Sequence, residues 1–208
     1  MANKYKLDKV CNHGYHYYYP DHFVDLRNER FNLVEIGYAE GQSHSFFREY
    51  FPNANVYSLD IDPCSIDSSH VVIKCDQSQT SDLVKSITKI EKAQIIIDDG
   101  SHHPRHQYET FCLFFDKLLE DGGIYIIEDI ECNYWRKGTT LYSYEIDGFS
   151  FIEQSKRWVE QINEEFSRVK NTLRISSITY GQNCVIVKKQ TSDETNYFAR
   201  SYRFSGLL

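Results

Sequence analysis

The sequence predicts an α/β fold: a mostly parallel sheet with helices on both faces and an antiparallel hairpin near its C-terminal end. Short runs of β-branched and aromatic residues alternate with longer amphipathic runs, a rhythm typical of strand–helix–strand units. Ile95, Ile96 and Ile97 follow one another without polar alternation, as expected of a strand covered on both faces of a parallel sheet. A chain of 208 residues suits one hydrophobic core, so we expect a single domain over 1–208.

The expected elements can be placed in order along the chain. Strands are predicted near 31–36, 55–60, 71–74, 94–98 and 124–128, and helices near 43–51, 81–91 and 104–120. The "DGG" at 121–123 is expected to stop the last of these helices. A further helix is predicted near 150–169. Two strands within 172–189, joined by a glycine turn at Gly181, are expected to close the sheet, and residues 1–30 to form an N-terminal cap of undefined structure.

Charge and composition exclude several classes of protein. Lys and Arg total 23 against 30 for Asp and Glu, and the net charge of −7 argues against a nucleic-acid partner, which would need clustered cations. The six cysteines are scattered without CxxC spacing, which is typical of a reduced intracellular chain without disulfides. No apolar run reaches the roughly 18 residues of a membrane span, and "MANKYKLDKV" lacks the apolar core of a secretory signal. We therefore expect a cytoplasmic protein without membrane or nucleic-acid partners, with homo-oligomers left open.

The turn "LVEIGYAEGQS" at 33–43 connects the first strand to the first helix and is the first candidate binding site. Small residues at Gly37, Ala39 and Gly41 let a ligand approach the backbone, and the next helix N-terminus offers free N–H groups, although such turns also occur for packing reasons. The GxGxxG pattern of dinucleotide-binding proteins is missing, because Ala39 stands in place of its central glycine. This disfavours NAD and favours a cofactor without a pyrophosphate.

Polar residues at the ends of neighbouring strands complete the cofactor hypothesis. Asp60 ends the second strand about 20 residues after the glycine turn, where a carboxylate can accept both hydroxyls of a ribose. Asp76 and Gln77 follow the third strand and are placed to bond the nitrogens of an adenine; taken alone, they are more typical of a solvated loop. Together with Glu35 on the first strand, they make the set expected for S-adenosylmethionine at three successive strand ends.

Two apolar runs end abruptly in carboxylates: "IIIDDGSHHPRH" at 95–106 and "GIYIIEDIE" at 123–131. The carboxyl ends of adjacent parallel strands meet at one edge, so Asp99, Glu128 and Asp129 are expected to lie together. Carboxylates held that close repel one another unless a cation neutralises them, and oxygen ligands without thiolates suit Mg²⁺. The alternative is that they only shape a turn or are solvated.

The residues around this acidic group include a candidate base. His102 follows Asp99 by three residues, and a neutral imidazole is the commonest general base near pH 7, so His102 and Asp99 are the candidate catalytic residues. For Asp98 a role in the turn and in capping the next helix is favoured. His103 and His106 fall at the start of that helix, where a solvated and a substrate-facing role are both open.

Four stretches together resemble a known family: "LDKVCNHGYHYYYPDHF", "EIGYAEGQSHSFFREYFPNANVYSLDIDP", "CDQSQ" and, most specifically, "IDDGSHHPRHQYETFCLFFDKLLEDGGIYIIEDIECNYW". The family is that of the metal-dependent S-adenosylmethionine sugar O-methyltransferases that modify deoxysugars of macrolides such as mycinamicin and tylosin. The likeness implies a Rossmann-like class I methyltransferase sheet, S-adenosylmethionine and Mg²⁺ as cofactors, and a sugar or glycoside as acceptor. Two features depart from the family: Cys132 stands where a hydroxyl residue is common, and the extra N-terminal domain of some members has no counterpart.

The resemblance also implies a role for each candidate residue. Asp99, Glu128 and Asp129 are expected to bind Mg²⁺, and His102 to act as the base. The residues expected around the cofactor are Glu35, Gly37, Asp60, Asp76 and Gln77, to which we add Gly41, Ser43 and Asp98. Those expected near the acceptor are Tyr134 and Trp135, to which we add His103.

The expected reaction is a Mg²⁺-dependent transfer of a methyl group from S-adenosylmethionine to a hydroxyl of a sugar, such as rhamnose in a glycan or glycoside. Two adjacent sugar hydroxyls are able to chelate the ion while one of them faces the methyl group. A catechol or another small molecule with adjacent hydroxyls is the alternative acceptor. A metal-dependent hydrolase would leave Glu35, Gly37 and Asp60 unused, and a non-catalytic nucleoside-binding module would leave the acidic group uncompensated.

Overall fold

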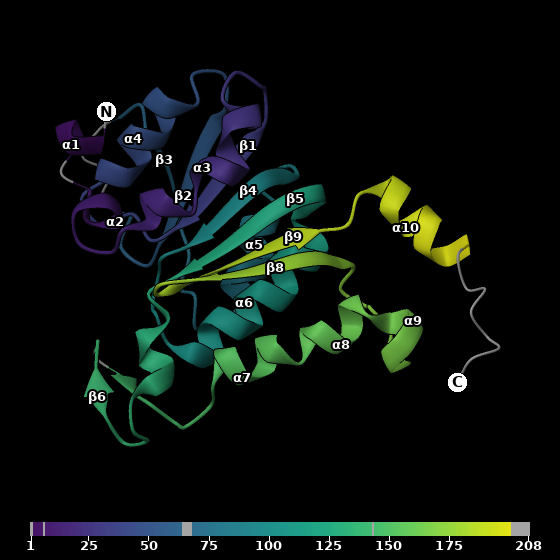
Figure 1. Ribbon diagram of the computed structural model, residues 1–208. Coiled ribbons are helices and arrows are strands. Elements are labelled where there is room, and N and C mark those ends of the chain that lie inside the picture. Colours follow the sequence, from purple (N-terminus) through teal and green to yellow (C-terminus); the bar gives the residue numbers. More distant parts are fainter. Residues whose placement is uncertain (1, 6, 64–67, 143, 201–208) are drawn as a thin grey trace.

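A seven-stranded sheet forms the centre of the protein (Figure 1), in a computed structural model that describes residues 2–5, 7–63, 68–142 and 144–200. The strand order is β3-β2-β1-β4-β5-β9-β8. The strands are β1 (Asn32–Ile36), β2 (Asn55–Asp60), β3 (Val71–Lys74), β4 (Ala93–Asp98), β5 (Leu119–Glu128), β8 (Ile175–Gly181) and β9 (Cys184–Lys189). The first five are parallel, whereas β9 and β8 are antiparallel. The predicted fold class is confirmed.

Helices connect the strands and cover both faces. The described helices are α1 (Ala2–Tyr5), α2 (Asp8–Cys11), α3 (Pro20–Phe23), α4 (Gln42–Tyr50), α5 (Thr80–Ile87), α6 (Pro104–Lys117), α7 (Phe151–Lys156), α8 (Trp158–Ile162), α9 (Glu164–Ser167) and α10 (Ser192–Arg200). Short 3₁₀ turns span Tyr15–Tyr17, Val24–Leu26 and Ile130–Tyr134, and a small separate sheet pairs β6 (Thr140–Leu141) with β7 (Tyr144–Glu145).

Some boundaries differ from the sequence expectations. The single helix expected near 150–169 is three short helices, α7 to α9. The "DGG" at 121–123 does not stop α6, which already ends at Lys117; these residues lie inside β5. Gly181 is the last residue of β8, and the hairpin turn is made by the two residues after it, of which Asn183 has the left-handed φ of 58°. The α10 helix was not expected from the sequence.

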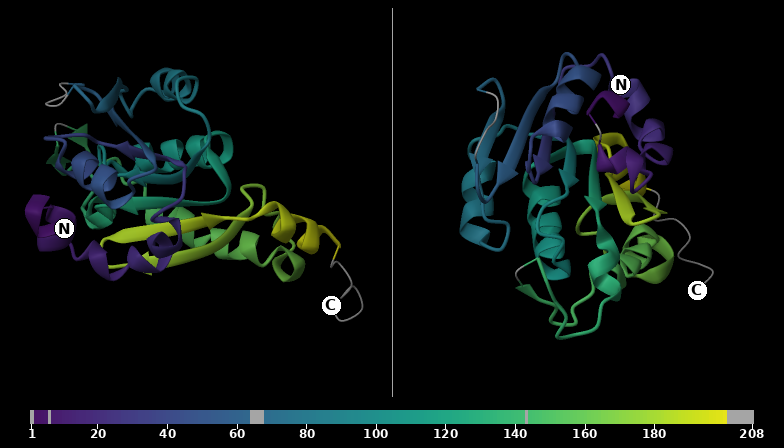
Figure 2. Two further views of the ribbon diagram at one scale, coloured as in Figure 1. Left: turned by 90° about the horizontal axis from the view of Figure 1, so that it is seen from above. Right: turned by 90° about the vertical axis from the view of Figure 1, so that its left-hand side faces the viewer.

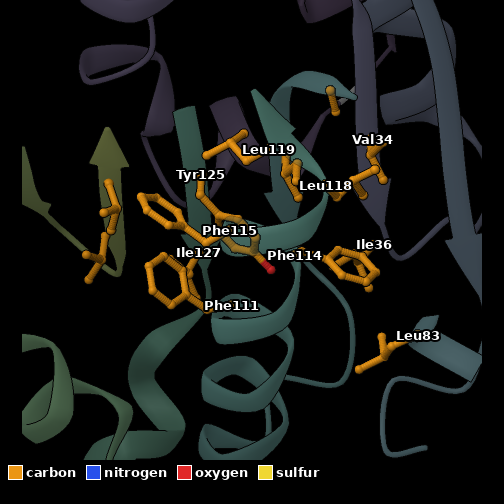
Figure 3. Close-up of a cluster of buried hydrophobic side chains, with 14 of the residues drawn as sticks. Val34, Ile36, Leu83, Phe111, Phe114, Phe115, Leu118, Leu119, Tyr125 and Ile127 are labelled. Atoms are coloured by element: carbon orange, nitrogen blue, oxygen red, sulfur yellow. The ribbon is translucent and has the colours of Figure 1, made fainter. Parts of the chain in front are cut away.

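The two faces of the sheet carry separate hydrophobic cores, because successive strand residues point to opposite sides. On one face, side chains of α6, including Phe111, Phe114 and Phe115, pack against Tyr125 and Ile127 of β5 (Figure 3). Helices α5, α7 and α8 contribute to the same core. Helix α4 and the N-terminal helices lie on the other face (Figures 1 and 2).

The expected N-terminal cap is an ordered part of this second core. Tyr15, Tyr19 and Phe23 are buried, and Phe23 meets Phe51, which follows α4, with ring centroids 5.4 Å apart. The cap therefore packs on the sheet beside α4. This position brings residues close to the N-terminus to the same sheet edge as the strand ends described below.

Two further observations concern membrane-spanning helices and the state of the cysteines. No helix among the described residues combines the length and the apolar composition that a membrane crossing requires. The cysteines within the described residues, Cys11, Cys75, Cys112, Cys132 and Cys184, have free thiols, and Cys64 lies outside the described residues.

Candidate functional site

The carboxyl ends of β1 and β4 meet at the point where the chain order of the sheet reverses. In open α/β sheets this is where ligands bind. The Asp99 N–H donates to the Ile36 carbonyl at 2.9 Å, and Gly37 has a φ of 97°. A Cβ atom on Gly37 would lie only 2.2 Å from the Asp99 carbonyl oxygen. The glycine is thus required for the close approach of the two strand ends.

A cavity of about 480 Å³ opens at this edge, a volume within the range of small-molecule sites. Of the residues expected around the cofactor, Gly37, Asp60, Asp76 and Gln77 line it. His102 also lines this cavity. Further lining comes from Ser101, His106, Tyr142 and Tyr144, among others.

Asp60 is the last residue of β2, and backbone N–H groups donate to both of its carboxylate oxygens. Its Oδ2 accepts the Tyr38 N–H at 2.7 Å, and its Oδ1 accepts the Asp62 N–H at 2.8 Å. Oδ2 also accepts the Ala39 N–H at 3.4 Å, whereas Oδ1 accepts one N–H and keeps an acceptor position for a ligand hydroxyl. The geometry suits the ribose-binding role expected for Asp60.

Gln77 and Asp98 form a buried pair behind the cavity. The Gln77 Nε2 donates to both carboxylate oxygens of Asp98 at 2.8 and 2.9 Å, and its Oε1 accepts the Ser101 N–H at 2.8 Å. Burial raises the pKa of Asp98 to about 7. Asp98 is fully buried and does not line the cavity. Asp98 was expected to cap α6, but the N-cap of this helix is His103. Asp98 instead orients Gln77.

The other residues expected near the cofactor lie outside the lining of this cavity. Gly41 has a φ of 71° and is the N-cap of α4. The Ser43 hydroxyl donates to Glu35 Oε1, and Glu35 is buried. The second oxygen, Glu35 Oε2, has no hydrogen-bond partner among the described residues. Glu35 Oε1 lies 3.6 Å from the ammonium group of Lys9, which also contacts Asp99, so Glu35 faces the acidic group and not the cavity.

Asp99, His102 and Asp129 form a group with the spacing of a metal site. One ligand atom from each lies within 4.8 Å of the others. His102 Nε2 lies 4.0 Å from Asp129 Oδ2, and the buried His102 Nδ1 has no partner among the described residues. The sequence expectation that Asp99 and Asp129 come together is met, and His102 joins them.

Glu128, the third carboxylate expected there, is bonded to the N-terminal cap. The Lys9 ammonium and the Tyr19 hydroxyl donate to Glu128 Oε2 and Oε1, respectively. Burial raises the pKa of Glu128 to about 7 against the lowering effect of Lys9. Burial likewise raises the pKa of Asp129, whose Oδ1 accepts the Tyr15 hydroxyl.

Aromatic rings of the β6–β7 hairpin stand over the metal-site group. Tyr142 lies edge-on to His102 with ring centroids 5.2 Å apart, and it stacks on Trp135 at 6.2 Å. Tyr134, also expected near the acceptor, is 73% exposed. Trp135 is therefore positioned at the site, whereas Tyr134 projects into solvent.

His103 was considered as a residue near the acceptor. In the structure it lies at the start of α6. It is buried, its Nδ1 accepts the Arg105 N–H at 3.2 Å, and its ring lies 4.4 Å from that of His106. His103 is thus the N-cap of α6, and its ring also meets that of Tyr144 with centroids 4.7 Å apart.

Sequence reasoning missed two sets of residues that the fold brings to the site. Lys9, Tyr15 and Tyr19 arrive from the N-terminal cap, and Tyr142 and Tyr144 from the β6–β7 hairpin. No periodic pattern connects either set to the strand ends. The available signals were the unusual density of His and Tyr in the first 30 residues and the family resemblance of the stretch 7–23.

No protein-family model matches the chain. Curated relatives were found, however. The chain is 33% identical over 145 residues to the 8-demethyl-8-alpha-L-rhamnosyl tetracenomycin-C 2'-O-methyltransferase of Streptomyces olivaceus, an alignment covering 65% of this chain and 38% of that protein. It is 32% identical over 136 residues to the mycinamicin VI 2''-O-methyltransferase of Micromonospora griseorubida, covering 59% of this chain and 33% of the relative. The aligned segments thus cover well under half the length of these relatives.

Solved structures agree with the sequence comparisons. The MycE methyltransferase from the mycinamycin biosynthetic pathway, in complex with Mg, SAH and mycinamycin VI, matches with a TM-score of 0.78 and 26% identity over 93% of this chain and 53% of that chain. A SAM-dependent methyltransferase from Archaeoglobus fulgidus shares the fold, with a TM-score of 0.52 at 11% identity. The resemblance to sugar O-methyltransferases and the Rossmann-like methyltransferase fold are confirmed.

Proposed function

We propose that this chain is a Mg²⁺-dependent O-methyltransferase that transfers the methyl group of S-adenosylmethionine to a sugar hydroxyl. One observation supports this most strongly: His102 belongs both to the lining of the cavity beside Asp60 and to the group formed with Asp99 and Asp129. Metal-assisted methyl transfer from a nucleoside cofactor requires the cofactor and the ion to lie next to each other. A residue that belongs to both sites is consistent with this arrangement. The named activities of the relatives agree with this proposal.

The cavity fits S-adenosylmethionine, which would supply the methyl group as part of a sulfonium. Asp60, already fixed by backbone N–H groups, would accept the ribose hydroxyls. Asp76 lines the same cavity and would bond the adenine amino group. Gln77 is tied to Asp98 and Ser101, so we assign it to shaping the cavity wall.

The acidic group fits Mg²⁺, because Asp99 and Asp129 bring hard carboxylate oxygens together without a thiolate, and His102 beside them is left for proton transfer. Asp99 and Asp129 would hold the ion, with the carboxylate of Glu128 beside them. The ion would supply positive charge that makes an alcohol more acidic. His102, whose Nδ1 is unpartnered, would take the proton from the acceptor hydroxyl.

The proposed acceptor is a deoxyhexose with adjacent free hydroxyls, such as rhamnose in a glycan or glycoside. The stacked rings of Trp135 and Tyr142 provide an apolar platform next to His102. The related proteins act, by name, on a rhamnosyl tetracenomycin and on mycinamicin VI. The choice of sugar over catechol rests on these relatives and on the platform.

Calorimetric titration with S-adenosylhomocysteine tests the cofactor site. We expect binding by the unmodified protein and roughly 10- to 100-fold weaker binding by Asp60→Ala, which loses a charged hydrogen-bond acceptor. Asp62→Ala is the matched control, since Asp62 is exposed and contacts Asp60 only through its backbone N–H. Equal affinities of the two variants, or no binding by the unmodified protein, would exclude this cofactor site.

A further inference from the structure

A buried lysine lies among the carboxylates of the candidate site. Lys9 is 4% exposed, and its Nζ lies 2.6 Å from Asp99 Oδ2 and 3.6 Å from Glu35 Oε1. It also donates to Glu128 Oε2. Lys9 thus contacts carboxylates from the ends of β1, β4 and β5, although it belongs to the four-residue helix α2.

The same N-terminal segment contributes two phenols beside the lysine. The Tyr15 hydroxyl donates to Asp129 Oδ1, and the Tyr19 hydroxyl donates to Glu128 Oε1. Both tyrosines are buried in the core on the α4 face. Residues 7–23, which we call the N-terminal segment, therefore attach to the acidic group through one cation and two hydroxyl donors.

The lysine compensates charges that burial would otherwise disfavour. Burial raises the pKa of Glu35 to about 7, and the charge of Lys9 acts in the opposite direction. Burial also lowers the pKa of Lys9, but the charges of Asp99, Glu128 and Glu35 outweigh it and hold that pKa well above its ordinary value. A charge buried in this way without its partner is strongly unfavourable, so the lysine and the carboxylates depend on each other.

We propose that Lys9 is a positioning residue: its ammonium group is the built-in counter-charge that docks the N-terminal segment on the acidic group and keeps Glu35, Asp99 and Glu128 together before a divalent ion binds. The inference rests on the proposed function for the divalent ion, which would then share Asp99 and Glu128 with Lys9. Lys9 does not line the cavity that we propose for the cofactor. Its role is to assemble the site.

Hydrogen–deuterium exchange of Lys9→Met in EDTA tests this role. Methionine has an unbranched side chain, as lysine does, but it carries no charge. We expect the amides of residues 15–23 to exchange roughly tenfold faster or more, because the segment loses its anchor. Lys4→Met is the matched control: Lys4 pairs with Glu49 from the same end of the chain but is exposed, so its removal should leave exchange unchanged.

Addition of Mg²⁺ then distinguishes two roles of Lys9: neutralisation of the carboxylates by its ammonium group, and packing of its side chain. The divalent ion should restore slow exchange in Lys9→Met, because it neutralises Asp99 and Glu128 in place of the ammonium group and lets the Tyr15 and Tyr19 hydroxyls hold the segment on Asp129 and Glu128. Faster exchange that Mg²⁺ does not reverse, or exchange in EDTA equal to that of Lys4→Met, would overturn the proposal. If calorimetry shows no Mg²⁺ binding to the unmodified protein, the metal site of the proposed function fails, and the comparison in EDTA still decides whether Lys9 anchors the segment.

A double-mutant cycle keeps the test informative if Lys9→Met folds poorly. Glu128→Gln should lower the melting temperature when Lys9 is present, since it removes a partner of the ammonium group. In the Lys9→Met background the same change should raise the melting temperature or recover folding, since it removes an uncompensated buried charge. An equal effect of Glu128→Gln in both backgrounds would show that the two residues are not coupled.

Discussion

His102 and Asp129 face each other across the candidate site, with His102 Nε2 4.0 Å from Asp129 Oδ2, and both residues have left-handed backbones, with φ of 55° and 50°. Positive φ is uncommon outside glycine, although His and Asp are among the residues that tolerate it best. Such conformations persist where the surrounding structure enforces them, and they cluster at functional sites. The strain falls on the two residues that we propose as base and metal ligand.

Asp129→Asn should separate metal binding from stability. The variant keeps the shape of the side chain and removes one charge from a group of mutually repelling carboxylates, so the melting temperature in EDTA should stay equal or rise. Its Mg²⁺ affinity should fall by roughly tenfold or more, as for other losses at a metal site. Calorimetry and thermal denaturation measure the two effects. Asp116→Asn, at an exposed Asp–Lys pair, should change neither, and unchanged Mg²⁺ affinity in Asp129→Asn would place the ion elsewhere.

His102→Ala should slow methyl transfer without affecting cofactor binding. The loss of a general base typically lowers kcat by roughly 10²–10⁴-fold. S-adenosylhomocysteine affinity should change little, because the proposed polar contacts to the nucleoside come from Asp60 and Asp76. Steady-state kinetics and calorimetry provide the two readouts, with His16→Ala at an exposed histidine as control. A variant that instead loses Mg²⁺ affinity would identify His102 as a metal ligand and leave the base unassigned.

Trp135→Ala should act on the acceptor. The indole ring stacks on Tyr142, which in turn contacts His102, so its removal takes away half of the proposed sugar platform. We expect the KM for a rhamnoside to rise by up to about tenfold, matching a stacking loss of about 0.5–1.5 kcal/mol, with kcat nearly constant. Tyr17→Ala, at a tyrosine 77% exposed on the N-terminal cap, serves as control. An unchanged KM would remove Trp135 from the acceptor site.

Stability should depend on pH through His106. Burial, with a smaller contribution from His103, lowers the pKa of His106 from 6.5 to about 4. Between these values the unfolded chain binds a proton that the folded chain does not, so the free energy of unfolding should decrease as the pH falls from about 6.5 to 4, by about 1–3 kcal/mol. Urea unfolding at several pH values should show a weaker decrease for His106→Gln than for His16→Gln. Identical pH dependence of the two variants would contradict this assignment.

The part of the site built from strand ends was predictable from the sequence. Asp60, Asp99 and Asp129 each follow an apolar run, and parallel strands deliver their carboxyl ends to one edge whatever the detailed packing. The roles of Gln77 and Asp98 were not predictable to the same degree. Their mutual bond depends on how the loop after β3 meets the end of β4, and sequence spacing carries no information on that contact.

The residues that complete the site come from segments without periodic patterns. Lys9 meets Asp99 across 90 positions of sequence, and an isolated lysine in a polar segment gives no sign that it will be buried. Tyr142 comes from a hairpin whose strands have two residues each, too short for alternation to be visible. Both contacts are produced by tertiary packing alone.

Metal-dependent methyl transfer to a sugar is the central proposal, and one assay addresses it directly. The protein is incubated with S-adenosylmethionine carrying a radiolabelled methyl group and with rhamnosides whose 2- or 3-hydroxyl is free or blocked, alongside catechol. We expect label in a rhamnoside with adjacent free hydroxyls, none after EDTA treatment, and recovery when Mg²⁺ is returned. Full transfer in metal-free buffer, or methylation of catechol with none of any glycoside, would contradict the proposal.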